Sequence, residues 1–223
     1  MTIGEPATLV TDYLLAMFTG VLGHRLGRAA RDAEWSAFIE TARMRGWWSV
    51  AFMATAVAGA AGGTVHGFQH AMARSVTTLL WLVTLESLVV AAFAVVAAAI
   101  VLIGWGPTVR FIATFAAAVA FGGYGLWVIK NPVFLSAIAA YGTAFAVLVG
   151  VRLSARPLDR GGRLLLAGVA LSLVAAGVQQ SGWSIHRNFN HNDLYHVIQA
   201  VAVWLLYRAA IAPDTFSGSS PSS

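Results

Sequence analysis

The chain has 223 residues, of which 58% are hydrophobic and 10% charged, a composition that predicts an integral membrane protein rather than a soluble domain. Because cysteine is absent, disulfides, iron–sulfur clusters, thiolate zinc sites and cysteine nucleophiles are excluded. The formal net charge of +5 does not indicate nucleic-acid binding, since the basic residues lie in short connections between apolar runs.

Seven apolar stretches are long enough to cross a bilayer as helices, because a hydrocarbon core of roughly 30 Å needs about 20 helical residues. β-Barrel strands would be about ten residues long with alternating polarity, whereas these stretches are unbroken and rich in Ala, Leu and Val. We therefore predict an all-α, seven-transmembrane-helix bundle in one domain, residues 1–213, followed by a disordered polar tail, residues 214–223. The predicted spans are residues 7–26, 47–68, 76–104, 108–130, 132–154, 162–183 and 192–212.

Arginine predicts the orientation of the bundle, because Lys and Arg accumulate in cytoplasmic loops. The side expected to face outward keeps only Arg74, Lys130 and Arg187. We therefore predict that the N-terminus lies outside and the C-terminus inside. Residues 32–40 are expected to form a short amphipathic helix on the inner bilayer surface. The arginines of the two main cytoplasmic connections are Arg25, Arg28, Arg31, Arg43, Arg45, Arg152, Arg156, Arg160 and Arg163.

Ionisable side chains inside the first three spans are candidates for function, because each costs roughly 2.5–3.5 kcal/mol on insertion scales. Asp12 lies about one turn into the first span, and His66 and His70 lie near the end of the second. Residues four apart share a helix face, so His66 and His70 can bind one ion. Glu86 lies near the middle of the third span and is expected to face the bundle interior.

A second histidine pair, His191 and His196, lies at the start of the seventh span. A spacing of five rotates by about 140° net, so these two do not share a helix face. Asn190 fits an N-cap, with Asp193 as the acidic partner of a capping box. Asp193 could equally orient a ligating histidine, because metal-bound imidazoles usually donate their second N–H to a carboxylate or carbonyl. The sequence leaves both roles of Asp193 open.

The predicted orientation places both histidine pairs and Asp12 on the outer side of the membrane, and there the chain resembles a known superfamily. It resembles the membrane hydrolases that include alkaline ceramidases and the adiponectin and progestin receptors. The match consists of the number of spans, His66 in the second span and the string HNDLYH at the start of the seventh. The string FNHNDLYHVIQ also looks like the signature of a bacterial seven-helix group related to that superfamily.

The chain departs from the superfamily pattern at two places. The superfamily's HxxxH pair on the seventh helix places its first histidine where this chain has Asn192, with His191 one residue early. The superfamily's aspartate on the third helix also has no counterpart early in the third span, because Glu86 lies deeper.

The resemblance implies a zinc site and hydrolysis of lipid amide or ester bonds by zinc-activated water. It also implies a bacterial inner-membrane protein whose site faces the periplasm, with membrane lipids as partners and substrate. His66 and His196 are the expected ligands, and the third ligand is His191 or His70. The expected base or orienting group is one of three acids, Asp12, Asp193 or Glu86.

Two other classes of protein fit the same histidines. His66 and His196 could ligate a haem from opposite sides of the bundle. A metal-sensing receptor or a structural protein without turnover would use the histidines to titrate or to lock helices together. Of these three classes, the zinc-dependent lipid hydrolase is our leading hypothesis, and the other two are its alternatives.

Overall fold

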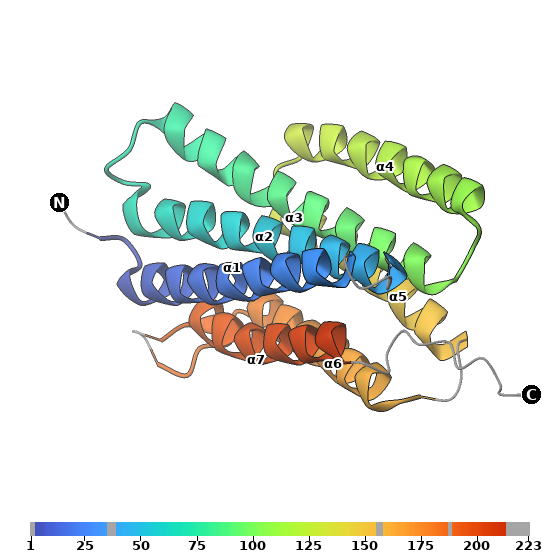
Figure 1. Cartoon of the computed structure of the whole chain (residues 1–223). Helices are drawn as coiled ribbons and strands as arrows, with labels where there is room; N and C mark the ends of the chain where they lie inside the picture. Colours follow the sequence, from blue (N-terminus) through green and yellow to red (C-terminus); the bar gives the residue numbers. More distant parts are fainter. Residues whose placement is uncertain (1–2, 35–38, 155–157, 187–188, 213–223) are drawn as a thin grey trace, which may run out of the picture.

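The computed structural model describes residues 3–34, 39–154, 158–186 and 189–212 of the chain. This part is all-α apart from an isolated bridge between His186 and Phe189. Its seven helices are long and apolar enough to cross a membrane, which confirms the predicted class of integral membrane protein. They run in alternating directions (Figure 1) and are α1 (Pro6–Glu34), α2 (Ile39–Phe68), α3 (Arg74–Leu102), α4 (Pro107–Lys130), α5 (Phe134–Ser154), α6 (Arg160–Ser181) and α7 (His191–Ile211).

The first two helices are longer than the apolar stretches that predicted them. α1 continues to Glu34 and α2 begins at Ile39, so most of the residues expected to form a separate amphipathic helix belong to the ends of these two helices. Residues 35–38 of that segment lie outside the described residues, as does the predicted polar tail. An existing helix extends readily, because each added residue gains one hydrogen bond, whereas a separate short helix would need its own costly nucleus. This difference favours the longer α1 and α2 over a separate amphipathic helix.

Glycine and proline set three helix boundaries in two of the turns. α3 is followed by Gly104, whose φ of 74° lies in the left-handed region that favours glycine. α4 begins at Pro107, whose missing N–H is tolerated in a first helical turn. α6 ends at Gly182, with a φ of 66°. The turn between α3 and α4 therefore lies where the sequence predicts it.

α3 forms the centre of the bundle and α4 its edge. The C-terminal half of α3 is rich in fully buried alanines, which allow the neighbouring helices α2, α4 and α5 to approach closely. α4 lies apart from α1, α6 and α7 and packs mainly against α3 (Figure 1). Its outer face carries large apolar side chains such as Phe111, Phe115 and Leu126, which are 70%, 61% and 67% exposed. That face suits contact with lipid.

A stripe of glycines on α2 receives the start of α1. A Cβ atom on Gly63 would lie 2.7 Å from the Cβ of Asp12, and one on Gly67 would lie 2.9 Å from Leu9. A Cβ on Gly59 would lie 3.2 Å from that of Ala16. Because these glycines recur every four residues, they form one face on which α1 approaches closely. The stripe therefore sets the position of Asp12.

Candidate functional site

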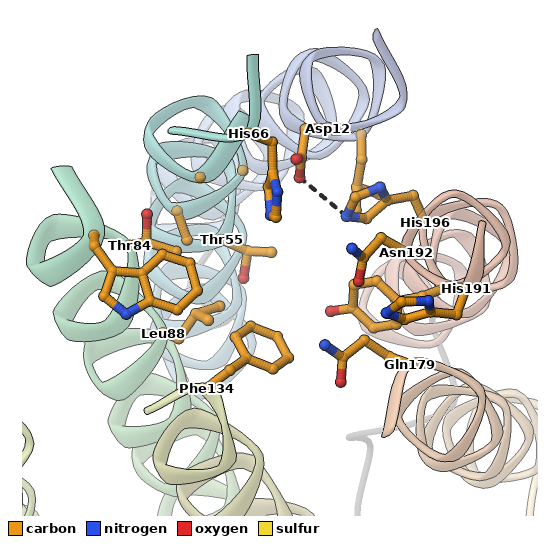
Figure 2. A pocket seen from close by; sticks show the side chains of 16 residues that line it. Asp12, Thr55, His66, Thr84, Leu88, Phe134, Gln179, His191, Asn192 and His196 are labelled. Atoms are coloured by element: carbon orange, nitrogen blue, oxygen red, sulfur yellow. Dashed lines mark ion pairs between the residues drawn. The ribbon is translucent and has the colours of Figure 1, made fainter. Parts of the chain in front are cut away.

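A cavity of about 180 Å³ lies at the end of the bundle where α1 and α7 begin and α2 ends. Its polar side chains come mainly from these three helices, and α3, α5 and α6 contribute to its remaining walls. Figure 2 shows the polar groups of α1, α2 and α7 facing one another across the opening. The lining residues are Asp12, Leu15, Thr55, Ala58, Gly59, Gly62, His66, Trp81, Thr84, Leu88, Phe134, Gln179, His191, Asn192, Tyr195 and His196.

A buried pair formed by Asp12 and His196 joins α1 to α7 at this cavity. Asp12 Oδ1 lies 3.0 Å from His196 Nε2, and each side chain is only 8% exposed (Figure 2). The second carboxylate oxygen, Asp12 Oδ2, is buried with no hydrogen-bond partner among the described residues. A buried polar atom without a partner is uncommon and costs free energy. The pair therefore holds an unused acceptor beside the cavity.

The other side of the His196 ring contacts Thr11, the residue before Asp12. Thr11 Oγ1 lies 2.9 Å from His196 Nδ1 and 3.3 Å from Asp193 Oδ1. It also lies 3.1 Å from the carbonyl oxygen of Thr8, in the preceding turn of α1. Two consecutive residues of α1 thus contact the two ring nitrogens of a histidine that α7 supplies.

Asp193 both caps α7 and contacts Thr11. Its Oδ2 accepts a hydrogen bond of 2.7 Å from the backbone N–H of Asn190, and the Asn190 side chain accepts from the N–H groups of Asn192 and Asp193. These bonds form the capping box that the sequence predicts. Because Oδ1 faces Thr11, the carboxylate also reaches the surroundings of His196. The two roles that the sequence left open are therefore compatible.

His66 lies on the opposite wall of the cavity, on α2. Its Nδ1 is 3.6 Å from Glu5 Oε2, and the rest of the ring faces the opening (Figure 2). The backbone N–H groups of Gly4 and Glu5 donate to the carbonyl oxygens of Gly67 and His66. The segment before α1 is thus fastened to the end of α2, and Glu5 is held beside His66.

The remaining candidate residues divide between the cavity and other places. His191 lines the cavity together with Asn192. His70 is exposed beyond the end of α2, where it packs near Gly4. Glu86 points toward α4, because a Cβ on Gly125 would lie 2.6 Å from Glu86 Oε2. Neither His70 nor Glu86 is among the described residues that line the cavity.

A protein-family model described as a family of unknown function, DUF6962, matches residues 7–215. The chain belongs to DUF6962. No curated protein and no solved structure matches it. The match extends from the start of α1 beyond the end of α7, so all the helices around the cavity of this DUF6962 protein lie within it.

A second, more apolar chamber lies beside the cavity of the DUF6962 protein and is lined mainly by α5 and α6. Five residues line both spaces, among them Tyr195 and Phe134, whose rings meet edge to face at 6.4 Å. The chamber has few polar side chains. Two of these are hydrogen-bonded to each other, because Gln199 Nε2 donates to Ser172 Oγ at 3.3 Å. The five shared residues are Leu15, Thr55, Leu88, Phe134 and Tyr195.

Sequence reasoning missed two residues of the DUF6962 site. Thr11 and Glu5 contact the two histidines directly, but neither belongs to a motif, and a threonine in a transmembrane helix is ordinary. Their roles follow from the packing of α1 against α2 and α7. The only signal was the position of Thr11 beside Asp12.

Proposed function

We propose that this protein hydrolyses an amide or ester bond of a membrane lipid, with a zinc ion held at the cavity by Asp12, His66 and His196. One observation carries the proposal. The buried Asp12–His196 pair borders a cavity with many polar side chains, and a more apolar chamber beside it shares five of its lining residues. A lipid with a polar head and an apolar chain has the same division.

The donor set fits zinc by chemistry. Carboxylate oxygen and imidazole nitrogen are ordinary zinc ligands, and a catalytic site needs three of them and an open position. Asp12 Oδ2 is a buried acceptor that the described residues leave without a partner. Those residues include no group of three His, Asp or Glu side chains close enough to hold a metal as they stand. Binding would therefore draw the Asp12–His196 pair and His66 closer together.

Zinc would polarise the lipid carbonyl and lower the pKa of a bound water to about 7. The protein's own groups would bind and orient the substrate. Gln179 and Asn192 line the wall that α6 and α7 form, where an amide can hydrogen-bond a polar head group. Tyr195 and Phe134 would separate the head from the chain, since they border both spaces. His191 remains a further candidate ligand on this wall.

The apolar chamber supports a lipid rather than a water-soluble substrate. It is lined by Ala137, Ile138 and Phe145 of α5 and by Leu173 of α6. Leu173 is 53% exposed on the outside of the bundle, so the chamber would open toward the bilayer between α5 and α6. The resemblance to ceramidases and adiponectin receptors, carried by His66 and the HNDLYH string, supports the same class of reaction.

The predicted orientation belongs to this proposal. Arg45 and Arg152 lie at the end of the bundle opposite the cavity, and an arginine-rich end is normally cytoplasmic. The cavity would then face the cell exterior, or the periplasm in a bacterial inner membrane. A single cysteine at His70 tests this in intact cells, because the chain has no other cysteine. Labelling of His70→Cys but not Arg160→Cys by an impermeant thiol reagent supports it, and the reverse contradicts it.

Metal analysis of the purified protein tests the site. We expect about one zinc per chain in the wild type and in His70→Ala, the matched control outside the cavity, and loss of zinc in His66→Ala and His196→Ala. Hydrolysis of lipid amides and esters in mixed micelles should follow the zinc content. Bound zinc without hydrolysis would favour the receptor class, and a Soret absorption band would favour the haem class. If the wild type shows neither bound metal nor hydrolysis, the proposal is overturned.

A further inference from the structure

We infer that Gln199 and Ser172 form a recognition site for a hydroxyl group on the hydrocarbon chain of the bound lipid. The two residues belong to α7 and α6, and both line the apolar chamber but not the cavity beside it. The inference rests on the proposed function in taking a lipid as the ligand, and it narrows that lipid to one with a hydroxylated chain. Binding measures the site whether or not the lipid is hydrolysed.

The number of protons that the pair can donate carries the first step. A glutamine amide has two N–H donors and a serine hydroxyl has one O–H donor. The described part of the chain shows a single hydrogen bond at these side chains, from Gln199 Nε2 to Ser172 Oγ at 3.3 Å. If the amide is turned the other way, the serine donates to the glutamine instead. In both orientations, two of the three protons have no acceptor among the described residues.

A second polar pair in the same chamber has no such spare protons. Thr55 Oγ1 donates to the carbonyl oxygen of Ala51 at 2.8 Å and also lies 2.8 Å from the Tyr141 hydroxyl. Because the threonine proton is already used, the tyrosine donates its own proton to Thr55. Both protons of this pair thus have acceptors. The spare donors lie at Gln199 and Ser172 rather than at the hydroxyls of α2 and α5.

The surroundings of the pair favour a ligand group as the missing partner. Ser172 is 6% exposed and Gln199 is half-buried, and the chamber around them includes apolar side chains such as Ile138 and Phe145. A polar group in such surroundings costs free energy unless it is hydrogen-bonded. A ligand hydroxyl can accept from a spare proton of the pair and donate to one of its oxygens, whereas a ketone can only accept. A hydroxyl therefore matches the pair best.

Helix geometry gives the position of this hydroxyl along the lipid chain. Gln199 follows His196 by three residues on α7, so it lies roughly 4.5 Å further from the end of the bundle that holds the cavity. An extended chain advances roughly 1.2 Å per bond, as an extended polypeptide does. With the scissile carbonyl beside His196, the matching hydroxyl lies about four bonds away, on the fifth carbon of the acyl chain.

Binding of fatty amides to the full chain tests the inference. Native mass spectrometry in detergent micelles gives apparent Kd values for long-chain amides whose fifth carbon carries a hydroxyl, a keto group or only hydrogen. We expect the wild type to bind the hydroxylated amide about tenfold more tightly than the unsubstituted one, with the ketone between them. In Gln199→Leu, which has a similar volume and no hydrogen-bonding group, this preference should fall to about twofold or less.

The ratio of the Kd values separates recognition from a merely structural role. If the bond only joins α6 to α7, Gln199→Leu weakens the binding of all three amides equally and leaves the ratio unchanged, which overturns the inference. Tyr141→Phe is the matched control in the same chamber and should keep the ratio, because the proton that it removes already has an acceptor. Should Gln199→Leu fail to fold, Ser172→Ala takes its place and should reduce the preference about threefold or more.

Hydrolysis of the same amides, measured separately, distinguishes this site from the proposed function. Preferred binding of the hydroxylated amide without zinc or hydrolysis supports the recognition site and removes the proposed function. Hydrolysis by a wild type that binds the three amides equally overturns the recognition site and leaves the proposed function standing.

Discussion

Two close pairs of an acidic and a basic side chain, one at each end of the bundle, have different surroundings. Arg152 Nη2 lies 2.6 Å from Asp159 Oδ1, and Asp12 Oδ1 lies 3.0 Å from His196 Nε2. The arginine and histidine side chains are 6% and 8% exposed, but Asp159 is 24% exposed where Asp12 is 8%, so only the Asp12–His196 pair has both partners buried.

The surroundings of the two pairs differ. Asp159 caps α6 by accepting from Gly162 N at 2.6 Å, and the Arg152 guanidinium occupies the space where a Cβ on Gly162 would lie. That pair closes the connection between α5 and α6. The Asp12–His196 pair instead borders a cavity and keeps an oxygen that no described residue uses. The two pairs therefore differ in position, because one closes a connection between helices and the other borders a cavity.

Replacing Asp12 tests the reactive side of the comparison and should give the largest effect. We expect Asp12→Asn to lower lipid hydrolysis by about 100-fold or more, because the amide can neither ligate zinc as a carboxylate nor accept a proton. Stability should fall by only about 1 kcal/mol, since the amide can still hydrogen-bond the imidazole. Initial rates and thermal unfolding of the same preparation measure both. Unchanged hydrolysis would remove Asp12 from the site.

Replacing Asp159 tests the structural side. We expect Asp159→Ala to lower the free energy of unfolding by about 3 kcal/mol or more, because the buried Arg152 loses its carboxylate partner and α6 loses its cap. Arg110→Ala, which breaks a pair whose Glu40 side chain is 52% exposed, should cost about 1 kcal/mol or less. Unfolding in detergent compares the two variants. If the two variants lost the same free energy of unfolding, the burial of Arg152 would contribute little to stability.

A methyl group between α1 and α2 should disturb the site without touching its polar atoms. Gly63→Ala should lower stability by about 1–3 kcal/mol and reduce zinc binding, because the new Cβ would lie 2.7 Å from the Cβ of Asp12 and α1 must shift. Gly122→Ala on α4 is the control, since a Cβ there meets no described atom within 4 Å. Zinc content and thermal unfolding check both variants. Equal behaviour would mean that α1 does not depend on the glycine stripe.

The smallest effect is expected at Glu86. Glu86→Gln should leave zinc content and hydrolysis within about twofold of the wild type, because this side chain points toward Gly125 and not into the cavity. Assays on the Gln variant beside Asp12→Asn make the comparison direct. A large loss of hydrolysis would return Glu86 to the catalytic candidates and weaken the assignment to Asp12.

The fold could be predicted because it depends on local properties of the sequence. Span length, apolar composition and breakers such as Pro107 are each contained within a few residues. The ends of α1 and α2 could not be placed, because helical hydrogen bonding continues beyond the apolar part of each span. Their apolar stretches marked where the chain can cross a bilayer rather than where the helices end.

The site was predictable only in part, because it depends on which helix faces approach one another. His66, His191 and His196 could be grouped from the predicted topology, and all three line one cavity. Spacing on α2 also suggested His70, yet the helix ends just before it and leaves it at the surface. The contact of Thr11 with a histidine 185 positions away could not be predicted without the packing of α1 against α7.

The capping box of α7 makes helix formation and site assembly a single event. One oxygen of Asp193 holds the backbone of Asn190, and the other lies against Thr11. If the first turn of α7 unwinds, the carboxylate leaves Thr11 and the imidazole loses its orientation at the same moment. The histidine is thus held in place only when both helices are fully formed and packed, so a partly folded chain would lack this arrangement of side chains.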